Sequence, residues 1–126
     1  MVRVISTHTA PAAIGPYSQA VVANGFLFAS GQVALDPKSG EITGATIEEQ
    51  AERCCRNIEG ILSANELAFD DVVKVTCFLA DMNDFSKFNV VYGKYFTAKP
   101  ARSCVAVKSI PKGLLCEIEI IAALKA

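Results

Sequence analysis

Apolar and charged residues alternate near the end of the chain. Within residues 115–124, Glu117 and Glu119 fall on one face of an extended chain, and apolar side chains fall on the other. Side chains of a β-strand point to opposite faces in turn, so this alternation predicts a strand with one buried face. Further strands are predicted at residues 72–79 and 102–107, where β-branched residues are frequent.

The amino-terminal part of the chain predicts a β-hairpin. The dipeptide Asn24-Gly25 separates apolar runs at residues 17–22 and 26–29, and Asn-Gly in this setting is the strongest short hairpin signal. A short edge strand is expected at residues 2–5, before a loop that contains two prolines. Together with the later segments, this makes six expected strands.

A helical period replaces the alternation in two segments. Thr46 and Glu49 have the spacing of a capping box, and apolar residues then recur at helical spacing to about Ala64. A second helix is expected to begin at Asn83 or Asp84. Its apolar stripe consists of Phe85, Phe88, Tyr92, Tyr95 and Phe96.

This order of elements predicts an α+β fold in a single domain over residues 1–126. Right-handed crossovers place both helices on the same side of the sheet, which gives two layers: a six-stranded mixed sheet with two helices on one face. The uncovered face is expected to carry Arg102, Cys104, Glu117 and Glu119, and to pack against further copies of the chain.

The composition supports an extensive subunit interface. Hydrophobic residues make up 52% of the chain and charged residues 20%, which is more apolar than an average domain. No apolar run approaches the ~18 to 20 residues that a membrane span needs, so no membrane partner is expected. The net charge of −1, with scattered Lys and Arg, argues against a nucleic-acid partner.

The cysteine and histidine content restricts the chemistry further. The chain has five cysteines and no CxxC motif, and its amino terminus lacks the apolar core of a signal peptide, which together predict reduced thiols in the cytoplasm. Burial in a helix face is favoured for Cys54 and Cys55. His8 is the only histidine, so neither a histidine-based metal site nor a Ser-His-Asp triad is expected.

Arg102 is the first candidate for a ligand-binding residue. It shares a predicted strand face with Cys104, and its planar guanidinium fits a carboxylate with two hydrogen bonds. We therefore expect this face to hold a small carboxylic acid. An ordinary surface arginine beside a small buried cysteine is the alternative that the hexapeptide alone leaves open.

Five stretches taken together resemble the RidA family, also called YjgF. In order, they are GPYSQA (15–20), SGQ (30–32), FNVVY (88–92), PARSCV (100–105) and CEIE (116–119). The resemblance implies a chorismate-mutase-like fold, a homotrimer with clefts between subunits, and no cofactor or metal. It also implies hydrolysis of reactive 2-imino acids, such as 2-iminobutanoate and 2-iminopropanoate, to 2-oxo acids and ammonia.

The same resemblance implies roles for individual residues. Arg102 would hold the substrate carboxylate, Glu117 would activate the attacking water, and Cys104 would line the pocket. Glu117 is expected beside Arg102, which would keep it ionised. A nucleophilic role for Cys104 is not favoured, because no histidine can serve as its base. Substrate binding is further implied for Tyr17, Ser30, Gly31 and Asn89.

Two other functions stay open at this point. A regulatory trimer that binds small 2-oxo acids would need the same arginine. A ribonuclease that inhibits translation would need an RNA-binding surface, which the near-neutral charge does not favour.

Overall fold

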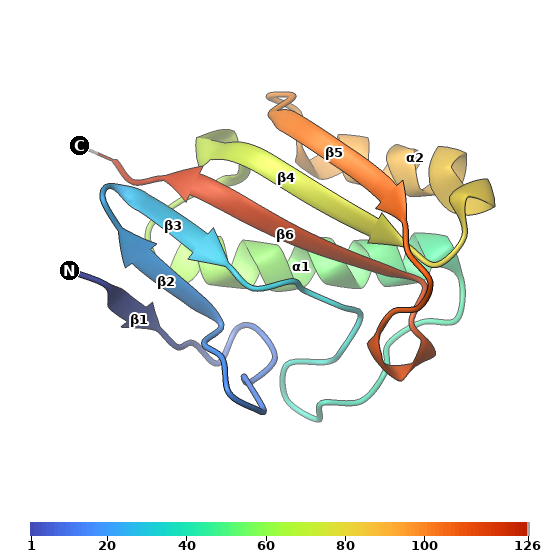
Figure 1. Ribbon diagram of the computed structural model, residues 1–126, viewed down its shortest axis with the longest axis horizontal. Coiled ribbons are helices and arrows are strands. Elements are labelled where there is room, and N and C mark those ends of the chain that lie inside the picture. Colours follow the sequence, from blue (N-terminus) through green and yellow to red (C-terminus); the bar gives the residue numbers. More distant parts are fainter. Residues whose placement is uncertain (126) are drawn as a thin grey trace.

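The computed structural model describes residues 1–125, which form a six-stranded mixed sheet with two helices against one face (Figure 1). The strands are β1 (Arg3–Ile5), β2 (Ala20–Ala23), β3 (Phe26–Ala29), β4 (Val72–Leu79), β5 (Ala101–Ala106) and β6 (Cys116–Ala123). The helices are α1 (Ile47–Ala64) and α2 (Phe85–Tyr95). The spatial order is β1-β2-β3-β6-β4-β5, in which only β4 and β5 pair in parallel. The predicted two-layer α+β fold is confirmed.

The predicted capping box starts α1. The Thr46 hydroxyl accepts a hydrogen bond from the Glu49 N–H at 3.2 Å, and the Glu49 carboxylate accepts one from the Thr46 N–H at 3.1 Å. At the other end, the Asn65 side chain donates to the Ile61 carbonyl at 2.8 Å. Such an N-cap is worth about 1 kcal/mol, and it fixes where the helix begins.

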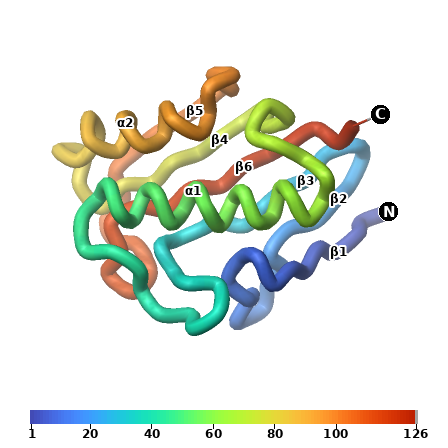
Figure 2. The backbone as a smooth tube through the Cα atoms, turned by 180° about the vertical axis from the view of Figure 1, so that it is seen from behind, coloured from blue at the N-terminus to red at the C-terminus, as the bar shows by residue number. Residues whose placement is uncertain are grey.

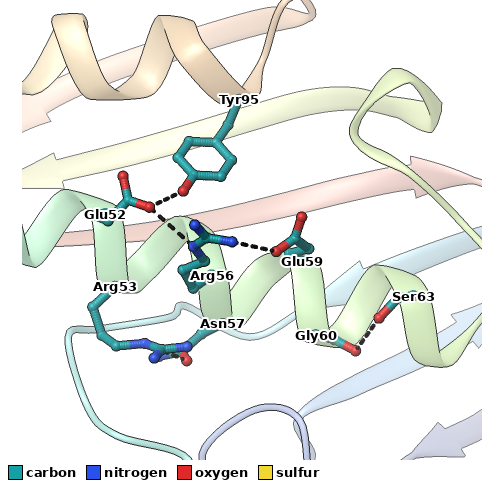
Figure 3. A network of polar contacts seen from close by, with 8 residues as sticks. All are labelled: Glu52, Arg53, Arg56, Asn57, Glu59, Gly60, Ser63 and Tyr95. Carbon is teal, nitrogen blue, oxygen red and sulfur yellow. Dashed lines mark hydrogen bonds and ion pairs between the residues drawn. The ribbon is translucent and has the colours of Figure 1, made fainter.

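The two helices lie side by side across the sheet, as the view from behind shows (Figure 2). A polar network joins them (Figure 3). Tyr95 of α2 donates a hydrogen bond to Glu52 of α1, and Arg56 Nε donates to the same carboxylate at 3.1 Å. The Arg56 guanidinium also lies 5.9 Å from the centroid of the Tyr95 ring. These contacts fix the carboxyl end of α2 against α1.

The strand β6 separates the core from the open face of the sheet, by which we mean the face without helices. Its residues alternate between buried and half-buried, as the sequence predicted. The buried ones are Cys116, Ile118, Ile120 and Ala122. Glu117 and Glu119 project from the open face, so their charges avoid the core.

The prediction that Arg102 and Cys104 share the open face with Glu117 is wrong. Cys104 pairs with Cys77 of β4, and Cys77 is fully buried beneath the helices. Paired residues of neighbouring strands point to the same face, so Arg102 and Cys104 lie on the helix side. Because β5 is an edge strand, both residues are half-buried there, which is how a charged residue can occupy the helix-covered face.

Tyr17 was predicted to begin a strand, but β2 starts at Ala20. The Tyr17 N–H donates to the Gly15 carbonyl at 2.9 Å, which closes a tight turn. Gly15 has a φ of 133°, a value that side-chain-bearing residues rarely adopt. The turn takes Tyr17 out of the sheet and leaves its side chain 54% exposed in the loop.

Candidate functional site

Four of the predicted site residues gather around one cavity on the side of the open face. The cavity has a volume of about 750 Å³, and its lining includes Tyr17, Ser30, Gly31 and Glu117. Glu117 extends from β6, whereas the other three come from the loop before β2 and the segment after β3. The fold therefore assembles this half of the site from segments that are far apart in the sequence.

Gly31 lies directly against the Glu117 carboxylate. The adjacent Gln32 holds its segment to β6: its N–H donates to the Ile118 carbonyl at 2.7 Å, and the Ile118 N–H donates back at 3.0 Å. A Cβ placed on Gly31 would overlap Oε2 of Glu117. This position therefore needs glycine because the Glu117 side chain approaches it closely. Its φ is not the reason.

The pKa of Glu117 is raised above the ordinary value of a glutamate. Burial is the larger cause, because it disfavours the charged carboxylate, and the negative charge of Glu119 adds to it. The expectation that a neighbouring Arg102 keeps Glu117 ionised is therefore not met within one chain. Glu117 has no cationic partner within residues 1–125.

The loop that carries Tyr17 is held by a buried glutamine that the sequence reasoning missed. The Gln19 side chain donates to the carbonyl groups of Ala10 and Pro11 at 3.1 and 2.8 Å, and it accepts from the Thr7 N–H at 2.7 Å. Its only signal in the sequence was its place in the GPYSQA stretch.

Ser30 is tied to the same loop. Its hydroxyl donates to the Ser18 carbonyl at 2.6 Å, and its N–H donates to the Gln19 carbonyl at 2.9 Å. The hydroxyl proton is thus committed within the protein, so Ser30 can only accept a hydrogen bond from a ligand.

Arg102 and Asn89 form a second group on the helix side of β5. Arg102 Nη1 donates to Asn89 Oδ1 at 2.7 Å, and the guanidinium carbon lies 4.5 Å from the centroid of the Tyr92 ring. Both residues line a cavity of about 390 Å³ together with Lys99. No carboxylate in the described part of the chain pairs with Arg102, so its charge is available to an anion.

Cys104 lies opposite Cys77 and is half-buried. Burial raises the pKa of the Cys104 thiol, and the nearby Arg102 charge opposes this shift without cancelling it. A thiol that keeps its proton at neutral pH is a poor nucleophile, which agrees with the expectation that Cys104 is no nucleophile. Neither of the two cavities has Cys104 in its lining, so its role in lining the pocket stays a prediction. Cys54 and Cys55 are buried in α1, as predicted.

The structure thus divides the predicted site into two halves. The Glu117 half and the Arg102 half lie on opposite faces of the sheet, and β4 lies between their strands. Each half has an open cavity. Lys38 and Lys112 also line the Glu117 cavity, but neither forms an ion pair with Glu117, and no carboxylate lines the Arg102 cavity in the described chain. Across residues 1–125, no cluster of potential ligands is arranged to hold a metal ion, and no helix is long and apolar enough to span a membrane.

Comparisons with known proteins place these features in context. A family model described as Endoribonuclease L-PSP matches residues 7–124. The chain is 46% identical over 121 residues to the human 2-iminobutanoate/2-iminopropanoate deaminase, covering 95% of this chain and 88% of the human protein. It is 51% identical over 123 residues to a RutC family protein of Pyrococcus horikoshii, with 97% and 98% of the two chains covered. The crystal structure of E. coli TdcF with bound serine has a TM-score of 0.92 at 40% identity, covering 98% of this chain and 99% of TdcF.

Proposed function

The chain belongs to the RidA family, which the L-PSP model describes, and we propose that it is an imine deaminase. The proposed substrates are reactive 2-imino acids, including the 2-iminobutanoate and 2-iminopropanoate that the human relative is named for. Water is added and ammonia is released, which leaves the 2-oxo acid. The imine carbon is already electrophilic, so the reaction needs a bound carboxylate and a placed water, without a metal or cofactor.

The observation that carries this proposal is the pair of incomplete halves. In residues 1–125, Arg102 has no carboxylate partner and Glu117, whose pKa is raised, has no cationic partner. The two residues lie on opposite faces, each beside an open cavity. We propose that three copies assemble so that Arg102 of one copy faces Glu117 of the next. The exposed apolar residues of the open face, which include Phe26, Phe28 and Val105, would be covered in such a homotrimer.

The chemistry follows from the two charges. Arg102 would bind the substrate carboxylate with two hydrogen bonds and fix the position of the imine carbon. Glu117 would take a proton from the attacking water as the C–O bond forms. The nitrogen of the protonated imine takes the electron pair of the C=N bond, which gives an amino alcohol, and Glu117 would return its proton to that nitrogen. As the C–N bond breaks and ammonia leaves, Glu117 would take the hydroxyl proton, which leaves the C=O group of the 2-oxo acid. General-base help of this kind is worth about 10²- to 10⁴-fold in rate.

Mixing two inactive variants tests the shared site. Arg102→Ala and Glu117→Gln should each abolish hydrolysis, measured as loss of semicarbazide trapping in a reaction coupled to a threonine dehydratase. Refolded together at equal amounts, they should recover about a quarter of the wild-type activity, because half of the copies supply an intact Arg102 and half an intact Glu117.

Each variant refolded alone is the control for this experiment. A mixture that stays as inactive as the two controls would contradict a site shared between copies. The assembly itself can be measured by light scattering, where three copies of the 13.4 kDa chain are expected. A monomer would contradict the proposal in the same way.

A ligand-binding role is the second candidate, and the serine bound to TdcF is the observation that favours it. The same coupled assay separates the two. Binding of 2-oxobutanoate through Arg102, with no faster loss of the imine, would favour a binding protein over an enzyme. Location in the cytoplasm stays a prediction from the reduced cysteines.

A further inference from the structure

The Arg102 guanidinium rests on side chains of α2. It lies 4.5 Å from the centroid of the Tyr92 ring and 5.6 Å from that of Phe85, and it donates to Asn89 at 2.7 Å. A cation over an aromatic face at such distances is attracted by the negative face of the ring. Since Asn89 and Tyr92 are three residues apart on one helix, they hold the guanidinium from the same side.

The Tyr92 ring is itself held firmly. Only 9% of the residue is exposed, and the ring stacks on Phe96 at a centroid distance of 4.4 Å with an interplanar angle of 18°. On its other side in the helix, Phe88 lies 6.0 Å away at 28°. Moving the Tyr92 ring would disturb this whole stack, so the surface beneath Arg102 is rigid.

We propose that Tyr92 is a positioning residue: with Asn89, it holds the Arg102 guanidinium in the orientation that receives a carboxylate. The guanidinium has five N–H donors, and Asn89 accepts from one of them. The guanidinium carbon lies over the Tyr92 ring, whereas a carboxylate bonds to the N–H groups at the edge of the guanidinium. The substrate therefore binds an arginine whose rotamer is already fixed. Binding then costs less side-chain entropy, and the affinity is higher.

The ring of Tyr92 has this role, and the hydroxyl does not. Tyr92 Oη is buried and has no hydrogen-bond partner among the residues that the structure describes. A hydroxyl needed to hold Arg102 would be expected to bond to it or to Asn89. Ring and hydroxyl can therefore be separated by substitution.

The inference rests on the proposed function for its substrate, but its primary test is binding and needs no turnover. Calorimetry with 2-oxobutanoate would compare the full-length wild type with Tyr92→Leu and Tyr92→Phe. We expect Tyr92→Leu to bind about tenfold more weakly, because the cation–π contact and the fixed rotamer are lost. Tyr92→Phe keeps the ring and should bind within about twofold of the wild type. In hydrolysis, Tyr92→Leu should raise KM and leave kcat nearly unchanged.

Tyr95→Leu is the matched control, because Tyr95 lies one turn along α2 and contacts Arg56 and Glu52 instead of Arg102. It should lower the melting temperature without lowering affinity for 2-oxobutanoate. A folded Tyr92→Leu protein with wild-type affinity and KM would overturn the inference while leaving the deaminase proposal intact. A wild type that binds 2-oxobutanoate but hydrolyses no imine would overturn the deaminase proposal and leave the inference standing.

Discussion

The two halves of the proposed site are held in place by different kinds of contact. The Glu117 half depends on backbone: a segment pairs with β6 and brings Gly31 against the carboxylate. The Arg102 half depends on side chains, since Asn89 and Tyr92 of one helix hold the guanidinium. The position of Glu117 is therefore sensitive to small shifts of the backbone. The position of Arg102 is sensitive to which side chains α2 carries.

The halves also differ in their electrostatics. Glu117 lies beside Glu119 and is partly buried, so its negative charge is disfavoured and its pKa is raised. Arg102 is half-buried on an aromatic surface, with no carboxylate near it in residues 1–125. Each half would be relieved by the opposite charge, which is the physical reason to expect that they meet across an interface.

Gly31→Ala is the change that should break the Glu117 half most severely. The new Cβ would overlap the carboxylate and push it from its position. A displacement of about 1 Å at a catalytic group can cost 10²-fold, so kcat/KM for imine hydrolysis should fall about 100-fold. The three nearest atoms all belong to the flexible Glu117 side chain, which can move away, so the free energy of unfolding in urea should fall by less than about 1 kcal/mol.

Gly93→Ala adds the same methyl group to α2, where no atom lies within 4 Å of the new position. It should raise the free energy of unfolding by about 0.5–1 kcal/mol, because alanine loses less backbone entropy in a helix. If Gly31→Ala instead kept the wild-type kcat/KM, the close contact between Gly31 and Glu117 would be disproved.

The pH dependence of hydrolysis should show whether the halves meet. Glu117 acts as a base only when unprotonated, so the rate should fall as the pH drops through its pKa, by up to about tenfold per pH unit. A neighbouring Arg102 lowers that pKa in the free enzyme, whereas a bound substrate carboxylate neutralises the arginine and lets it rise. The acidic limb of kcat should therefore lie at higher pH than that of kcat/KM. Acidic limbs at the same pH in the kcat and kcat/KM profiles would mean that the Arg102 charge does not affect the pKa of Glu117.

The last predicted effect is a small change of stability in the Arg102 half. Tyr92→Phe removes a buried hydroxyl that lacks a hydrogen-bond partner within the described chain. The free energy of unfolding should rise by about 1 kcal/mol, seen as a higher urea midpoint at an unchanged slope. A lower midpoint would show that the hydroxyl is satisfied in solution, and would count against assigning the role to the ring alone.

Local signals in the sequence predicted the helices and strands, although the start of β2 was placed too early, at Tyr17. The cap of α1 follows from Thr46 and Glu49, and the two faces of β6 follow from alternation across residues 115–124. These features depend on neighbours in the chain, so the sequence contains the whole interaction. The candidate site was predicted in the same way as a set of residues, and most of that set does lie beside one of the two cavities.

The same local signals did not predict which face of the sheet each strand residue would occupy. Alternation states that Arg102 and Ser103 face opposite ways, but only the register of β5 on β4 decides which of them meets the helices. Tyr92 was overlooked as a site residue for a related reason. An aromatic residue in a helical apolar stripe is typical of a core. No local sequence signal distinguishes an aromatic ring that contacts an arginine from one that does not.

The division of the site between two faces of the sheet has a consequence for the amount of protein that must be present. The activity of a site within one chain is proportional to the number of chains at any dilution. In the proposed assembly, dilution separates the copies and removes activity, because a separated chain has only the two halves that cannot meet. The abundance of the protein, as well as its affinity for the imine, would then determine how quickly a reactive intermediate is cleared.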